Sequence, residues 1–334
     1  MSSLPANGVL ASYWIPQVGI GNPMQYVDVP LTDILNYTLP NGAPQTTIVF
    51  LASASFISAD APYVDIPVPI QQQMTLQPGE AQTNVQQLQA AGIKVLLTLV
   101  GSNGYGWDGV NDPNAFAAYI KSNVVDAYGL DGIDIDNEFS NLPENPQNFM
   151  NVAGALRSAL GGGLLTKALW SDLDYFTVPV SSGFPNAGSY LGQLLDLGSS
   201  MAYGDGYAEQ ISFIQSYMNI QAGGQNVGMN PSQLAIGVQA GPPDGSWMTP
   251  IDEVYRLAGW TMSNLAGMML FTFSQDIQQF TYSPQNSPSK MYPNPDDHQW
   301  QRTIVAGFLG QPQPSTSKSV VPPPPPPHTP SLQV

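Results

Sequence analysis

Short apolar runs and longer amphipathic segments follow one another along most of the chain. Eight of the apolar runs are rich in β-branched and aromatic residues and have the length of strands. Because helix-length segments separate these runs, the pattern is that of parallel βα units. The predicted strands are Val9–Trp14, Thr46–Ala52, Lys94–Val100, Gly132–Asp136, Leu164–Leu169, Gly198–Tyr203, Gln233–Val238 and Gly267–Phe273.

The segments between the predicted strands carry helical patterns, and several begin with a capping residue followed by proline. In Asp112-Pro113, Asn145-Pro146 and Thr249-Pro250 the first side chain can cap a helix while proline takes the first helical position. The predicted helices are Glu80–Ala91, Pro113–Tyr128, Pro146–Leu160, Ser189–Leu197, Tyr207–Ile220, Pro250–Asn264, a weaker candidate at Leu31–Tyr37 and a closing helix at Asp296–Leu309.

Eight strands and eight helices in alternation predict an α/β protein, with residues 1–310 forming one (β/α)8 TIM barrel. An open, doubly wound sheet is the alternative. Such a sheet would normally carry a glycine-rich phosphate-binding turn after its first strand, whereas Ile15-Pro-Gln17 follows that strand here. The barrel is therefore the favoured fold.

The predicted strand Gly132–Asp136 lies in a dense group of acidic residues. Asp131, Asp134, Asp136 and Glu138 fall close together in a chain where 10% of residues are charged. Because a strand alternates its faces, the last three acids share one side and the two isoleucines between them point to the other. Asp131 has the opposite parity at the start of the strand, so we expect it to be structural.

Like charges held so close together cannot all ionise normally, so at least one pKa in the group should be raised. A carboxylic acid that stays protonated near neutral pH can serve as a general acid. In a barrel these acids would rise toward the carboxyl-end face, where barrel enzymes have their active sites. A hard-cation site and a solvated acidic edge are the other interpretations. Calcium ligands, however, usually lie on flexible turns, and the residues that flank these acids are hydrophobic.

Composition limits the class of ligand. The net charge is −16, from 24 acidic and 8 basic residues, which excludes a nucleic-acid partner because phosphate binding needs clustered Lys or Arg. We expect a neutral or cationic ligand. Cysteine is absent, so the chain has no disulfide framework and no thiolate chemistry. We expect no metal and no cofactor.

The two ends of the chain differ in composition from the rest. Residues 311–334 contain the six-proline run Pro322–Pro327, and such sequence stays extended and unpacked, so we expect a disordered tail. Met1–Gly8 lacks the basic and apolar regions of a signal peptide, and the sequence leaves the cellular location open. We expect a monomer without a membrane partner. His298 and His328 show no ligand spacing and are predicted to lie on the surface.

The acidic segment carries a resemblance to a known family. Asp131-Gly-Ile-Asp-Ile-Asp-Asn-Glu138 resembles the D-G-x-D-x-D-x-E signature of family 18 glycoside hydrolases, the chitinases and endo-β-N-acetylglucosaminidases. Met201-Ala-Tyr203 is similar to the sixth-strand M-x-Y of that family, and Lys94–Gly101 is similar to its third-strand K-V-L-L-S-x-G-G. Gly267–Phe271 resembles the eighth-strand G-x-M-x-W.

The chain departs from the chitinase pattern at several of these positions. Val100 replaces a glycine, Gly204 stands where chitinases usually carry Asp or Asn, and Phe271 stands in place of Trp. These departures, with Asn137 before the glutamate, are more like the short endo-β-N-acetylglucosaminidases. The interval between strands seven and eight is also too short for the large insertion domain of many chitinases. The two activities stay equally open.

The resemblance implies a retaining endo-glycosidase that hydrolyses β-1,4 linkages of N-acetylglucosamine in an oligo- or polysaccharide, with the substrate's own acetamido group as nucleophile. Glu138 would act as general acid and then general base. Asp136 would hold the acetamido N–H, Asp134 would share a proton with Asp136, and Tyr203 would donate to the acetamido oxygen. A lectin-like barrel that binds without hydrolysis is the alternative, but inactive relatives typically lose the glutamate at the position of Glu138.

Aromatic residues are the candidates for sugar binding, because the apolar faces of pyranose rings pack on aromatic rings. The resemblance implies that Phe271 forms the floor of the acetamido pocket. Met201 is a further substrate-binding candidate, although filling of the barrel, together with Met268 and Met269, is the simpler interpretation. The candidates for stacking, for each of which burial in the core is an equally good interpretation, are Trp14, Trp107, Trp170 and Trp247.

Overall fold

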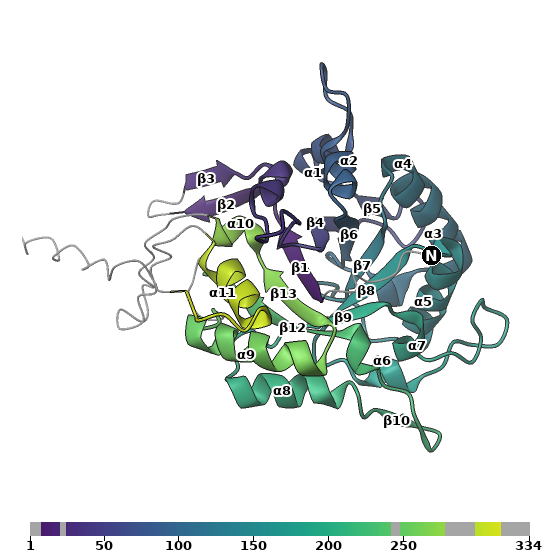
Figure 1. The fold of residues 1–334 in the computed structure, drawn as a ribbon. Coiled ribbons are helices and arrows are strands. Elements are labelled where there is room, and N and C mark those ends of the chain that lie inside the picture. Colours follow the sequence, from purple (N-terminus) through teal and green to yellow (C-terminus); the bar gives the residue numbers. More distant parts are fainter. Residues whose placement is uncertain (1–7, 21–24, 242–247, 278–297, 315–334) are drawn as a thin grey trace, which may run out of the picture.

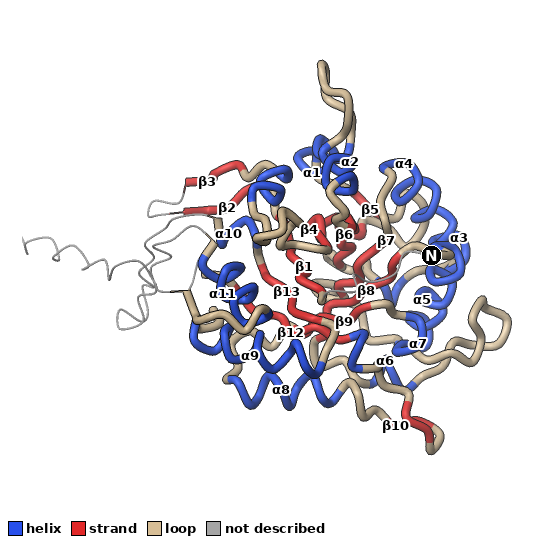
Figure 2. The backbone as a smooth tube through the Cα atoms, viewed as in Figure 1, coloured by secondary structure: helices blue, strands red, loops and turns tan. Residues whose placement is uncertain are grey.

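The computed structural model describes residues 8–20, 25–241, 248–277 and 298–314. Eight parallel strands close into a barrel, and helices surround it (Figures 1 and 2). The ring closes because the first barrel strand pairs with the second barrel strand on one side and with the last on the other. The strands around the barrel are β1 (Val9–Trp14), β4 (Ile48–Phe56), β6 (Lys94–Val100), β7 (Gly132–Asp136), β8 (Leu164–Leu169), β9 (Leu197–Ser200), β12 (Leu234–Gln239) and β13 (Gly267–Phe271).

The predicted (β/α)8 barrel is therefore confirmed, and the open sheet is excluded by the closing pair of β1 and β13. Strands β1, β6, β7 and β8 have the predicted bounds. Strand β4 runs further than predicted, where it pairs antiparallel with the short strand β5 (Val64–Asp65). Strand β9 ends earlier than predicted, at Ser200, as the chain turns into the mouth of the barrel.

Most predicted helices are present, with shorter bounds at several ends. Residues 113–128 form one continuous helical segment with a π turn (Lys121–Val125) between α3 and α4, and the 189–197 prediction shrinks to four residues. The predicted segments correspond to the 3-10 helix Leu31–Asn36, α2 (Asn84–Ala90), α3 (Pro113–Ile120), α4 (Asp126–Tyr128), α5 (Pro146–Leu160), α7 (Leu191–Leu194), α8 (Tyr207–Ser216), α9 (Ile251–Asn264) and α11 (Gln299–Phe308). Elements that the sequence did not predict are the hairpins β2 (Gln17–Ile20) with β3 (Gln25–Asp28) and β10 (Gln221–Ala222) with β11 (Gln225–Asn226), α1 (Val68–Met74), α6 (Asp174–Thr177), α10 (Phe273–Asp276), and the 3-10 turns Trp107–Gly109 and Pro231–Gln233.

Two of the three predicted cap residues cap their helices. The Asp112 carboxylate accepts from two backbone N–H groups of α3, and the Asn145 side chain accepts from Asn148 N of α5 at 3.2 Å. The cap at Thr249 is wrong. The Thr249 hydroxyl instead donates to the Tyr203 carbonyl at 3.0 Å and accepts from Gln239 N at 3.1 Å.

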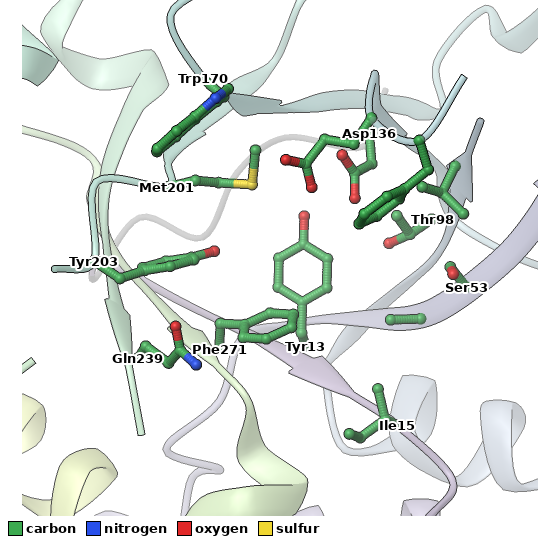
Figure 3. Close-up of a pocket in the computed structure, with 14 residues that line it drawn as sticks. Tyr13, Ile15, Ser53, Thr98, Asp136, Trp170, Met201, Tyr203, Gln239 and Phe271 are labelled. Atoms are coloured by element: carbon green, nitrogen blue, oxygen red, sulfur yellow. The ribbon is translucent and has the colours of Figure 1, made fainter. Parts of the chain in front are cut away.

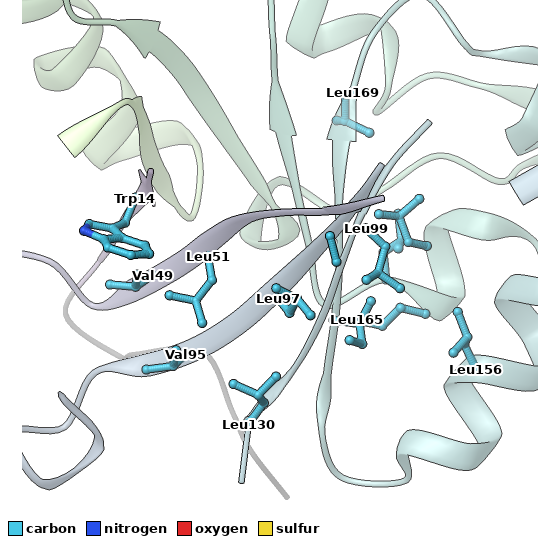
Figure 4. Packing of buried hydrophobic residues seen from close by; sticks show 14 of the residues in the cluster. Trp14, Val49, Leu51, Val95, Leu97, Leu99, Leu130, Leu156, Leu165 and Leu169 are labelled. Atoms are coloured by element: carbon cyan, nitrogen blue, oxygen red, sulfur yellow. The ribbon is translucent and has the colours of Figure 1, made fainter. Parts of the chain in front are cut away.

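The apolar core has two layers, one inside the barrel and one between the strands and the helices, and Figure 4 shows part of the second. Inside the barrel the character of the side chains changes along the strand register. Leu96 and Leu164, which flank Gly132, belong to the apolar interior, and the next inward layer is Thr98, Asp134 and Thr166. The barrel is thus filled by apolar groups below and becomes polar toward its carboxyl end. The acidic residues therefore lie directly above a close-packed apolar layer.

Asp131 has the structural role that the strand parity predicted. Its carboxylate accepts from Lys94 Nζ at 2.8 Å, Gln89 Nε2 at 2.9 Å and Val95 N at 3.0 Å. These bonds tie the start of β7 to β6 and α2.

The surface prediction for His298 is wrong, because this side chain is 1% exposed. Its backbone N–H donates to the Asp276 carbonyl, which holds the start of α11 against the core, with the imidazole beside Tyr37 and Phe273. His328 lies outside the described residues.

Within the predicted tail, the backbone carbonyl oxygen of Gln311 accepts a hydrogen bond from Tyr255 Oη of α9 at 2.7 Å. No helix in the described part of the chain is long and apolar enough to cross a membrane.

Candidate active site

A pocket of about 490 Å³ lies at the carboxyl end of the barrel. This volume is in the range of small-ligand pockets. Six residues singled out in the sequence line it, namely Asp136, Glu138, Trp170, Met201, Tyr203 and Phe271. Figure 3 shows the Tyr203 hydroxyl pointing into the pocket and Trp170 at its rim. The other lining residues are Tyr13, Ile15, Ala52, Ser53, Thr98, Val100, Phe139 and Gln239.

Asp134 lies beneath the pocket and is 1% exposed. The residues that pair with it in register on β6 and β8 are Thr98 and Thr166, and both donate their hydroxyls to its carboxylate, at 3.0 and 2.6 Å. Tyr13 Oη of β1 donates a third bond at 2.7 Å. Burial raises the pKa of Asp134 to about 6, although these hydroxyl donors oppose the shift.

Asp136 ends β7, and its environment favours the protonated form. Burial raises the pKa of Asp136 to about 8, with further contributions from the neighbouring charges of Glu138 and Asp134. The Oδ1 atom is buried and has no hydrogen-bond partner among the residues that the structure describes. A buried polar atom without a partner is uncommon in native proteins and is expected where a ligand supplies the missing bond. The sequence expectation of a raised pKa in this group is confirmed.

Glu138 lies two residues beyond the end of β7, in the segment that leads to α5. Burial raises its pKa, and the positive charge of Lys167 opposes the shift. The side chain is partly exposed to the pocket. A carboxyl group that is protonated more readily than usual and open to a cavity can donate a proton to a bound ligand.

Tyr203 and Phe271 form one wall of the pocket (Figure 3). Their rings stack with centroids 5.8 Å apart and an interplanar angle of 19°. Gly237 leaves room for this wall, because a Cβ there would come within 2.9 Å of the Tyr203 ring. Burial and the nearby acids raise the pKa of Tyr203 well above its ordinary value, so the phenol is a neutral donor.

The four tryptophans predicted for sugar stacking separate into different roles. Trp170 is 45% exposed and lines the pocket. Trp14 and Trp107 are fully buried, with their indole N–H groups bonded to backbone carbonyls, so for both the stacking prediction is wrong. Both rings face the layer between strands and helices, where the apolar surroundings hold them. Trp247 lies outside the described residues.

The methionines also separate. Met201 is partly exposed and lines the pocket, so barrel filling is wrong for it, while the substrate-binding prediction agrees with its position. Met268 and Met269 are fully buried, as the barrel-filling interpretation predicted.

Several site residues were not singled out in the sequence. Thr98 and Thr166 could have been found, because each is a polar residue inside an otherwise apolar strand and matches the inward parity of Asp134. Tyr13, Phe139 and Gln239 line the pocket without any such signal.

A buried ion pair lies behind the site, on the outer face of the barrel. Lys167 Nζ is 2.5 Å from Asp172 Oδ2, and the two side chains are 1% and 12% exposed. Asp172 also accepts from Tyr217 Oη at 2.8 Å, and the ammonium lies 5.9 Å from the centre of the Phe149 ring. This pair fixes the turn that follows β8 and carries Trp170. Within the described residues no group of three His, Asp or Glu side chains is placed to hold a metal ion.

A closed (β/α)8 barrel with buried carboxyl groups at its carboxyl end is the arrangement that the family 18 resemblance implied, although many unrelated enzymes share this fold. Solved structures with similar folds include a family GH18 chitinase from Chromobacterium violaceum, with a TM-score of 0.60 and 18% identity, covering 92% of this chain and 85% of that one. An endo-beta-N-acetylglucosaminidase from Cordyceps militaris has a TM-score of 0.56 and 17% identity, with 90% of each chain covered. At these identities the likeness concerns the fold.

The sequence itself also matches a relative. It is 31% identical over 225 residues to an endo-beta-N-acetylglucosaminidase of Flavobacterium sp. strain SK1022, a match that spans 63% of this chain and 68% of the relative. A scan of the sequence against models of protein families found no match. The chain belongs to glycoside hydrolase family 18, as its acidic motif indicated.

Proposed function

We propose that this glycoside hydrolase is a retaining endo-β-N-acetylglucosaminidase that cleaves the β-1,4 bond between the two N-acetylglucosamine residues of an N-glycan core. The observation that carries the proposal is the placement of Asp136 and Glu138 in one pocket, where the Asp136 Oδ1 atom finds no hydrogen-bond partner among the described residues. The relative from Flavobacterium, which bears this activity in its name, favours N-glycans over chitin as substrate. Phe271, where chitinases carry Trp, supports the same choice.

Glu138 is the general acid of the proposed mechanism. Burial raises its pKa and so favours the protonated form, which donates its proton to the glycosidic oxygen as the C1–O bond breaks. The acetamido carbonyl oxygen of the same sugar attacks C1 and forms an oxazolinium ion. Glu138, now ionised, then takes a proton from the water that opens this ring, which regenerates the acid with retention at C1.

Asp136 orients the acetamido group. Its Oδ1 accepts the acetamido N–H, and its negative charge stabilises the oxazolinium ion as this forms. Burial raises the pKa of Asp136 more than that of Asp134. The proton therefore stays on Asp136 until the positive charge of the oxazolinium ion favours its ionised form, and Asp134 then takes the proton. Tyr203 donates its phenolic hydrogen to the acetamido oxygen, Phe271 forms the floor beneath the methyl group, and Trp170 and Met201 contact the sugar at the rim.

The proposal is tested by incubating the enzyme in parallel with a high-mannose glycoprotein and a chitin oligomer. We expect release of the glycan with one N-acetylglucosamine left on the protein, and little cleavage of chitin. Cleavage of the chitin oligomer alone would identify a chitinase and contradict the proposed substrate. Binding of either glycan without any product would instead favour the lectin-like alternative.

The role of Glu138 is tested by Glu138→Gln, which keeps the shape of the side chain but cannot donate the proton. We expect kcat to fall by roughly 10³-fold or more, because general acid–base catalysis contributes on the order of 10²–10⁴-fold and this proton transfer serves both steps. Thermal melting should stay close to that of the wild type. Activity within about tenfold of the wild type would rule out Glu138 as the acid.

A further inference from the structure

The segment that carries Glu138 takes no part in the strand pairing of the barrel. Strand β7 ends at Asp136, and residues 137–145 belong to neither helix nor strand until α5 begins at Pro146. General-acid catalysis nevertheless requires the carboxyl group to be held within a fraction of an ångström of its productive place. The contacts that hold this segment come from another loop, residues 101–109, which follows β6.

Trp107 fixes the start of the segment. Its indole N–H donates to the carbonyl oxygen of Asp136 at 3.1 Å and is shared with that of Leu99 at 3.3 Å, so that it links the ends of β7 and β6. The side chain is fully buried, with its ring against those of Phe56, Phe116 and Phe149. An indole locked in this way is a rigid donor at a backbone position two residues before Glu138.

Asp108 fixes the segment at both ends. Its carboxylate accepts from the backbone N–H of Asn145 at 2.8 Å and from the side-chain amide of Asn137 at 3.5 Å. Tyr175 Oη donates a further bond, at 3.1 Å to Oδ2. Asp108 is 7% exposed, and burying a carboxylate is costly unless it is hydrogen-bonded. The cost and the number of donors indicate a specific function for this carboxylate.

Two glycines bring the loop into direct contact with the acid-bearing residues. A Cβ on Gly101 would lie 2.4 Å from the Glu138 carbonyl oxygen and 2.8 Å from Ser140 N, and a Cβ on Gly106 would lie 2.7 Å from Ser140 Cβ. Between these contacts Phe139 has a φ of 61°, a left-handed conformation that is unfavourable for a bulky residue. The surrounding contacts therefore impose a backbone path that the segment would not adopt alone.

We propose that Trp107 and Asp108 are positioning residues for the general acid, and that the loop 101–109 is the template on which residues 136–140 are shaped. This inference rests on the proposed role of Glu138. Neither side chain touches the substrate pocket, so both act through the backbone and the neighbours of Glu138. A loosened template would let the carboxyl group of Glu138 move away from the glycosidic oxygen and toward water.

The test compares Trp107→Phe with the matched control Trp14→Phe. Both tryptophans are fully buried and each donates its indole N–H to a backbone carbonyl, but Trp14 bonds to Val29, away from the acid segment. We expect Trp107→Phe to lower kcat by roughly tenfold to 10²-fold with KM within about twofold, since a misplacement of about 1 Å can cost that much. Trp14→Phe should lower the melting temperature by a similar amount and keep the wild-type kcat.

The pH profile gives a second readout that a general loss of stability would not produce. The groups whose charges interact with Glu138 are Asp136, Lys167 and Tyr203, and Asp134 and Asp172 act on Asp136. All of them are unchanged in Trp107→Phe. Burial raises the pKa of Glu138, so a carboxyl group that moves toward water loses part of that shift. The alkaline limit of activity should therefore move to lower pH in Trp107→Phe and stay in place in Trp14→Phe.

Asp108→Asn is the second variant, because the amide keeps the volume of the side chain and removes its charge. Like Trp107→Phe, it should lower kcat. It provides the test if Trp107→Phe does not fold. Equal kcat and equal pH limits in the Trp107 and Trp14 variants, together with an unaffected Asp108→Asn enzyme, would overturn the inference. An active Glu138→Gln enzyme would instead refute the proposed function, so the two failures can be told apart.

Discussion

Asp136 has the most perturbed environment of the acidic residues at the pocket. It ends a buried strand, borders two other carboxyl groups and leaves one oxygen atom without a partner in the described part of the chain. Each of these features favours the protonated group. The same features become useful when a ligand supplies an N–H donor and a positive charge, because both favour the ionised group. The environment therefore disfavours the ionised carboxylate until a ligand with an N–H donor and a developing positive charge is bound.

This environment predicts how stability depends on pH. An unfolded Asp has a pKa of about 3.9, and burial raises that of folded Asp136 to about 8. The folded chain thus holds this proton more tightly, so the stability that the protonated group contributes is present at low pH and is lost as the pH rises through about 8. Between about pH 5 and about pH 8 the wild type should lose melting temperature more steeply than Asp136→Asn, which cannot ionise.

The measurement is thermal melting of both proteins across that range. One pKa unit corresponds to about 1.4 kcal/mol, and about 1 kcal/mol shifts the melting temperature of a large domain by roughly 2 °C or more. Asp136→Asn should therefore be more stable than the wild type at about pH 8 by at least about 2 °C, while its kcat falls sharply. Parallel melting profiles for the two proteins would show that Asp136 is already ionised in the folded state.

At the residue scale the sequence predicts the acids better than the aromatic residues. The alternation of acidic and apolar residues fixes which side of β7 carries Asp134 and Asp136, because a strand has a strict period of two. Trp107 has no such periodic context, since it lies in a loop whose path depends on Gly101 and Gly106. Nothing local separates a buried indole from an exposed one such as Trp170, and that distinction required the tertiary structure.

At the element scale, β8 has different chemistry on its two faces. Thr166 points into the barrel and supports Asp134, while Lys167 points outward beneath α5 and pairs with Asp172. Removing one partner of a buried ion pair leaves an uncompensated charge in an apolar layer. This pair also supports the turn with Trp170, which links the outer layer of the barrel to the rim of the pocket.

Lys167→Met should therefore destabilise the fold, by about 3–5 kcal/mol as measured by chemical denaturation. The matched control is Lys121→Met, which removes an ion pair with Asp126 whose side chains are 32% and 58% exposed. Exposed pairs contribute about 0–1 kcal/mol, so the control should stay close to the wild type. Lys167→Met with Asp172→Asn should recover part of the loss. A Lys167→Met enzyme as stable as the control would show that Asp172 finds other partners.

Strands were predicted with closer bounds than helices, for a physical reason. The barrel strands are buried on both faces, so β1, β6 and β8 read as mainly apolar runs with clear ends and match to the residue. Strand β7 also matches to the residue, because its acidic and apolar residues alternate with the period of a strand. The hairpins β2–β3 and β10–β11 are short and lack such runs. Helix α7 is only four residues long, because the chain turns into β9 before a second helical turn can form.

At the scale of the whole molecule, the closed barrel separates stability from chemistry. Apolar residues fill the lower interior and the layer under the helices, and the acids occupy the carboxyl end. This division is general for barrel enzymes, so the fold by itself specifies no reaction. Alternation of strands and helices was sufficient to predict the barrel, whereas the shape of the pocket depends on loops after β7, β8 and β9 that carry no periodic signal. The boundary of the domain near residue 310 stays a prediction.

In the proposed mechanism the nucleophile is the substrate's own acetamido group, held by Asp136. The decisive measurement is cleavage of two substrates that differ only at C2 of the reacting sugar, one with the acetamido group and one with a hydroxyl. We expect turnover of the first and none of the second, because the second lacks the nucleophile. Ready cleavage of the hydroxyl substrate, with a sugar trapped covalently on a carboxylate of the enzyme, would contradict this mechanism.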